Sequence, residues 1–179
     1  GNLDLIAGHA DMGAGGSASL LGGTSVSGST GSVKVASPTS SGDSSGDVSV
    51  TTGDSLSGSA GSLLFSVGES GTTAGDISVM SGRGTNGGDV SVSAGSGSVG
   101  TGGRLNMQSG VGATRSGDVV IGSASSSRSG DAHLTTGEAS SKTGSLKLST
   151  GASADGSSGD ISVRVGDSSS SMASGVDIS

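Results

Sequence analysis

Residues 46–53 read GDVSVTTG, and this stretch decides the fold that the sequence predicts. Val48 and Val50 are two residues apart, so in an extended strand their side chains point to one side and Ser49 points to the other. Gly53 follows the strand and permits the positive φ that a sharp corner needs. The stretch therefore predicts a half-buried strand of five or six residues that ends at a corner.

The same pattern recurs along the whole chain as a five-residue phrase: Gly, a small or acidic residue, an apolar residue, any residue, and a second apolar residue. Its copies are spaced by 13 to 15 residues. The next position on the same side of the strand holds a small or modest side chain in most repeats. A disordered Gly/Ser linker, which composition alone favours, would not hold this period. The copies begin at Gly1, Gly16, Gly31, Gly46, Gly61, Gly75, Gly88, Gly103, Gly117, Gly130, Gly144 and Gly159, with an offset copy at Ser174.

Each repeat carries too little apolar surface to be stable alone, so it must stack on its neighbours. The period therefore predicts an all-β fold: a single-stack β-solenoid of about 12 coils with 13–15 residues per coil. We expect parallel, in-register strands and a narrow interior of Val, Leu and Ile with Ser, Ala and Thr. Residues 1–179 would form one continuous solenoid segment, excerpted from a longer repeat protein or filament.

Composition excludes several classes of protein. The chain has 38 Gly, one Phe, one Pro and no Trp, Tyr or Cys, which leaves nothing to build a bulky core or disulfides. A net charge of −7 with only eight Lys and Arg offers no basic patch for nucleic acid. Apolar runs are short, so we expect no membrane span.

Aspartate follows the starting glycine in six copies of the phrase. A short acceptor at a corner is the favoured interpretation, because it can bind a backbone N–H there. Calcium is the alternative, since Asp76 with Asp89 and Asp118 with Asp131 lie in adjacent coils and would repel each other. The glycine spacing of known calcium-binding nonapeptides is absent. We predict no metal site and leave calcium at these two pairs open. The six are Asp47, Asp76, Asp89, Asp118, Asp131 and Asp160.

No residue is predicted to be catalytic or to bind a cofactor, and the protein is not expected to be an enzyme. Asp131 and His133 lie on a solvated strand face, where no oriented base can form. His9 has only Asp11 as a nearby carboxylate. GRGTNG at 82–87 fits a phosphate-binding pattern, but so many glycines produce such matches by chance. N-glycosylation sequons are absent, while O-linked glycans on Ser and Thr stay open.

The strings SGDVSVTTGDS (45–55), AGDISVMSGRG (74–84) and SGDISVRVGDSSS (158–170) resemble Ser/Gly-rich β-solenoid repeats of extracellular fibres, appendages and cell surfaces. The resemblance covers the whole chain and implies a structural rod or filament segment. Its implied partners are further coils of its own chain or copies of itself, and its implied place is extracellular or at the cell surface. The alternative is an adhesin or ice-binding solenoid that presents one face to a surface, although its outward Thr positions are irregular.

Overall fold

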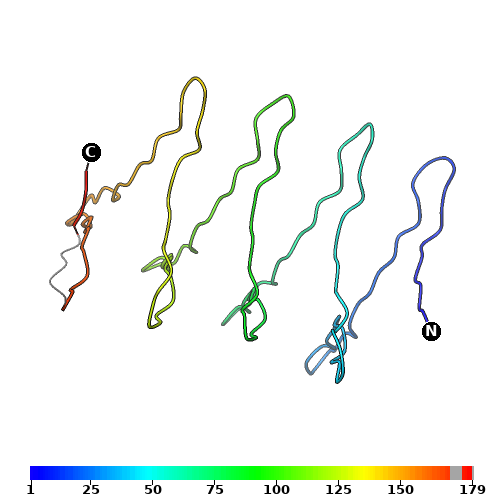
Figure 1. Cartoon of the computed structure of the whole chain (residues 1–179). Coiled ribbons are helices and arrows are strands. Elements are labelled where there is room, and N and C mark those ends of the chain that lie inside the picture. Colours follow the sequence, from blue (N-terminus) through cyan, green and yellow to red (C-terminus); the bar gives the residue numbers. More distant parts are fainter. Residues whose placement is uncertain (170–174, 179) are drawn as a thin grey trace. The chain divides into compact units, whose positions relative to one another are not determined.

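The computed structural model describes residues 1–169 and 175–178. No helix and no strand forms within these two ranges. The chain divides into two units, Gly1–Ser91 and Val92–Ser179. Each unit consists of extended segments joined by loops with narrow necks (Figure 1). That residues 1–179 are one continuous segment of a longer protein stays a prediction.

The predicted β-solenoid is wrong. No described residue is buried, and Val48 and Val50, which should line its interior, are 53% and 58% exposed. The chain exposes 18095 Å², whereas a compact 16.4 kDa protein exposes about 7,500 Å². Two aliphatic side chains per repeat do not offset the conformational entropy of so many glycines. Closing a short loop costs less entropy than bringing together phrases a whole repeat apart, so the contacts that form are local.

In the unit Gly1–Ser91, the recurring contact joins two glycines across a loop. The N–H of Gly16 donates to the carbonyl of Gly8 at 2.8 Å, and the N–H of Gly31 donates to that of Gly23 at 2.8 Å. We call this arrangement a neck: the starting glycine of one phrase meets the glycine seven residues into the previous repeat, and the residues between them form a loop. Gly88 and Gly82 close a third neck at 3.1 Å.

The unit Val92–Ser179 uses the same construction. Gly103 donates to the carbonyl of Gly95 at 2.8 Å, and Gly117 donates to that of Gly110 at 2.9 Å. Glycines at the same repeat positions therefore close loops in both units, in five repeats of the described chain.

Each loop contains one bend, and repeat length sets its position. In 15-residue repeats the bend covers three residues and begins ten residues after the starting glycine, as at 26–28 and 56–58. It shrinks to two residues, as at 71–72, in 14-residue repeats. It begins one residue earlier, as at 84–86, in 13-residue repeats. The loop therefore absorbs every change in repeat length, and the phrase keeps its length.

The prediction that the second glycine supplies a positive φ at a corner is also wrong. Gly13, inside a loop, is the one glycine with a positive φ, at 91°, in the part of the chain that the structure describes. Gly8 and Gly23 stand at the necks with open space where a Cβ would lie. A loop of several residues spreads the reversal over its bend, so no sharp corner forms at the neck.

The small residue six positions after each starting glycine is explained by the neck. In two closed necks, a Cβ built on Gly16 would lie 3.5 Å from Ala7 Cβ, and one built on Gly103 would lie 3.4 Å from Ala94 Cβ. The starting glycine of one repeat therefore packs against this position of the previous repeat. Larger side chains at this position would hold the two backbones apart.

Candidate functional site

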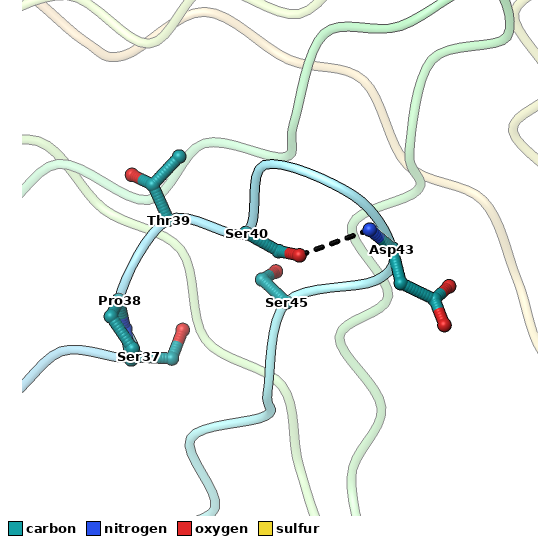
Figure 2. Close-up of a pocket in the computed structure, with 6 residues that line it drawn as sticks. All are labelled: Ser37, Pro38, Thr39, Ser40, Asp43 and Ser45. Carbon is teal, nitrogen blue, oxygen red and sulfur yellow. Dashed lines mark hydrogen bonds between the residues drawn. The ribbon is translucent and has the colours of Figure 1, made fainter.

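An open hollow of about 390 Å³ lies beside the bend at 41–43. Ser40 shapes this bend, because its Oγ accepts the N–H of Asp43 at 3.1 Å. Asp43 Oδ1 in turn accepts the N–H of Ser44 at 2.8 Å. Figure 2 shows the Asp43 carboxylate turned away from the hollow. The lining residues are Ser37, Pro38, Thr39, Ser40, Asp43 and Ser45.

This hollow has no chemistry of an active site. It is lined by four hydroxyl side chains, Asp43 and Pro38, with no His, Lys, Arg or Cys. A serine hydroxyl is a weak nucleophile unless an oriented base takes its proton, and no such base lines the hollow. Its residues are exposed, apart from the half-buried Ser37. Small-molecule sites are mostly apolar and largely closed, so we interpret the hollow as the concave side of a bend.

Serine hydroxyls hold the bends in five repeats, and the sequence analysis missed them. Ser25 Oγ accepts the N–H of Gly28 at 2.9 Å, and Ser55 Oγ accepts the N–H of Gly58 at 3.0 Å. Ser153 and Gly156 form the same bond at 3.1 Å. Ser70 bonds to the N–H of Thr72 at 3.2 Å in a shorter loop. Each of these serines, like Ser40, stands nine residues after a starting glycine. That recurrence, with Gly or Asp three residues later in the 15-residue repeats, was the signal that could have found them.

Three neighbouring repeats place glycine at this same position, for a different reason. A Cβ on Gly84 would lie 2.9 Å from the carbonyl oxygen of Asn86, and one on Gly97 would lie 2.7 Å from that of Thr101. A Cβ on Gly112 would collide with the carbonyl oxygen of Arg115. Real Cβ atoms do not come this close to backbone, so these bends require glycine where the others use serine.

The six predicted aspartates do not act as turn acceptors. None of them accepts a backbone N–H in residues 1–169 and 175–178, where Asp43 and the bend serines take that role. Asp118 instead accepts two bonds from Arg115 Nη2, at 2.9 Å and 3.2 Å. The phrase aspartates lie in extended segments, away from the bends where N–H groups converge.

Metal binding finds no support in the described ranges, which contain no group of three or more His, Cys, Asp or Glu side chains placed to hold an ion. Asp76, Asp89 and Asp131 form no ion pair there. Calcium at Asp76 with Asp89 and at Asp118 with Asp131 remains untested.

The structure brings His9 together with Asp11 and does not bring His133 to Asp131. His9 Nε2 lies 3.3 Å from Asp11 Oδ1, but both side chains are almost fully exposed. An exposed histidine beside one carboxylate lacks the fixed orientation that catalysis needs.

The apolar residues of the phrase are exposed to a degree that depends on their position. In most pairs the first residue is half-exposed, as in Val33 at 50%, and the second is more exposed, as in Val35 at 70%. Leu3 and Leu5 are the exception, since both are 84% exposed. Apolar residues in the loops, such as Val26 and Leu56, are fully exposed. Extended phrases therefore present a partly sheltered apolar edge. No helix in the described residues is long and apolar enough to cross a membrane.

Comparison of this chain with models of known protein families finds no match, and comparisons with curated proteins and with solved structures find none either.

Proposed function

We propose that this chain is a structural segment of an extracellular fibre, appendage or matrix, and that it acts by associating with copies of itself. One observation carries the proposal: the chain has a regular array of apolar pairs, and its described residues form no core in which to bury them. Apolar surface left in water favours association, and its regular spacing favours an ordered assembly over random collapse.

Composition and local structure support this function over the other classes. The hollow beside the bend at 41–43 has no group that activates a hydroxyl, so a structural function is favoured over an enzymatic one. Acidic residues dominate the charge, which disfavours nucleic acid as a partner. Ser and Thr side chains on the exposed loops are accessible acceptors for O-linked glycans. The adhesin or ice-binding alternative needs one regular outward face, and the residue after the apolar pair varies from Gly122 to Arg164.

Sedimentation velocity of the purified chain over a range of concentrations, followed by electron microscopy, tests this function. We expect particles far larger than 16.4 kDa above a threshold concentration, and elongated fibres in the micrographs. An expanded monomer at every concentration would contradict the proposal and would favour a Gly/Ser spacer.

A further inference from the structure

We infer that a second copy of this chain docks on the apolar pair and the backbone edge of each phrase, leaving the loops in solvent. This inference rests on the proposed function and specifies its contact surface. It concerns the phrase segments of each unit separately. A phrase segment runs from a starting glycine to the residue six positions on, as in residues 31–37 and 46–52 of the first unit and residues 103–109 and 144–150 of the second.

The first argument is the exposure of the apolar pairs. Leu63 and Leu146, at the first apolar position, are 51% and 52% exposed, while Phe65, at the second, is 70% exposed. Residues between the members of the pair are mostly polar and include Lys34, Asn106 and Lys147. Burial away from water is therefore favourable on only one side of the phrase.

The second argument is the backbone of the phrase. Outside the five necks, the described residues form no backbone-to-backbone hydrogen bond apart from any at Ser168. The N–H and C=O groups of residues 47–51 are therefore open to solvent along an extended segment. An extended segment with open backbone groups and alternating side chains accepts another strand along its edge. Docking would satisfy the backbone and cover the apolar pair in the same step.

The third argument identifies the occupant as a second copy. The chain exposes 18095 Å², roughly 10,000 Å² more than a compact protein of its mass. A standard interface buries only about 1,600 Å² in total, so one small partner would leave most of this surface in water. A partner that carries the same phrase every 13 to 15 residues matches the whole array. A second copy of this chain carries that array at the same spacing.

The loops are excluded from the contact by their construction. Among the described residues, necks separate five of the loops from the phrases, as Gly23 and Gly31 do around residues 24–30. Serine hydroxyls bend the loop away from an extended path, as Ser25 does. A strand edge needs several extended residues in a row, so docking is confined to the phrases.

The test compares three double variants in sedimentation velocity and measures the concentration at which assembly begins. Val48→Ser with Val50→Ser removes one apolar pair. Val26→Ser with Leu56→Ser removes equally apolar side chains from two loops. Leu64→Ser with Val120→Ser removes apolar side chains that point to the opposite side of their phrases. No described residue is buried, so none of the three variants disrupts a folded core.

We expect the threshold concentration to rise about tenfold in the phrase variant and to stay within about twofold in the other two. An unchanged threshold in the phrase variant would overturn this inference, as would an equal rise in the loop variant, and both outcomes would leave the proposed function standing. A wild-type chain that never assembles would overturn the proposed function and this inference together.

Discussion

The neck at Gly31 gives the sharpest prediction about the repeat itself. Replacing Gly31 by Ala places a Cβ 2.8 Å from the backbone nitrogen of Gly23. Ordinary van der Waals contact begins at 3.4 Å, so the two backbones must move apart. The hydrogen bond from the N–H of Gly31 to the carbonyl oxygen of Gly23 measures 2.8 Å. A shift of about 0.6 Å would lengthen it beyond the usual range of about 2.7–3.2 Å.

Loss of this hydrogen bond has a modest and measurable effect. A typical intramolecular hydrogen bond contributes about 1 kcal/mol net, which corresponds to roughly fivefold in the ratio of closed to open necks. Amide hydrogen exchange of the monomer, followed by NMR below the assembly threshold, measures that ratio directly. The amide at position 31 should exchange about fivefold slower than an open-chain amide in the wild type, and at the open-chain rate in Gly31→Ala.

Gly23→Ala is the matched control, because it changes the other glycine of the same neck. A Cβ built on Gly23 meets nothing within 4 Å, and its carbonyl still accepts the bond. The amide of Gly31 should keep its protection in this variant. Equal protection in Gly31→Ala and wild type, or equal loss in both variants, would refute the reasoning about the neck.

Two further predictions concern a bend and the assembly. Ser25→Ala should speed exchange of the Gly28 amide by about two- to fivefold, because the hydroxyl that accepts its N–H is removed. Ser27→Ala, in the same bend, should leave the exchange rate of this amide unchanged. Equal effects of the two substitutions would refute the role of Ser25. Raising the salt concentration from about 0.1 M to about 1 M should lower the concentration at which assembly begins, as followed by light scattering. The screening length falls from about 10 Å to about 3 Å, so copies that each carry a charge of −7 repel less. Light scattering that decreases with salt would contradict an apolar contact surface.

The division of each repeat into a phrase and a Ser/Gly-rich loop was predictable from the sequence, while the necks and bends that shape the loops were not. In the structure, starting glycines such as Gly16 and Gly103 lie against the small residue six positions into the previous repeat. The pair at Val48 and Val50 is about half-exposed. The alternation at residues 46–53 predicts a half-buried strand, but no strand forms there, and Val48 and Val50 are 53% and 58% exposed. It does not show where a partner for that segment comes from, because alternation is the same for a strand paired within a chain and one that is unpaired.

The bends were missed because their signal lies in the loop, in residues that composition makes common. Ser25, Ser40 and Ser55 are three of many serines, and only their fixed distance from the starting glycine marks them. The recurrence of aspartate after the starting glycine, as at Asp47, is easier to see than that of the bend serines, but it does not mark residues that bond to a turn. Their position in an extended segment leaves them far from the N–H groups that a bend brings together.

Limited trypsin digestion of the assembled chain tests the central claim most directly, because the chain has four basic residues in its phrase segments and four in its loops. If copies bury the phrases and leave the loops in solvent, cleavage should occur after the loop residues Arg83, Arg115, Arg128 and Lys142. Lys34, Arg104, Lys147 and Arg164 in the phrase segments should be protected. A chain kept monomeric by dilution should be cut after all eight. Equal cleavage at both sets of sites in the assembled chain, or protection of the loop sites, would contradict the account.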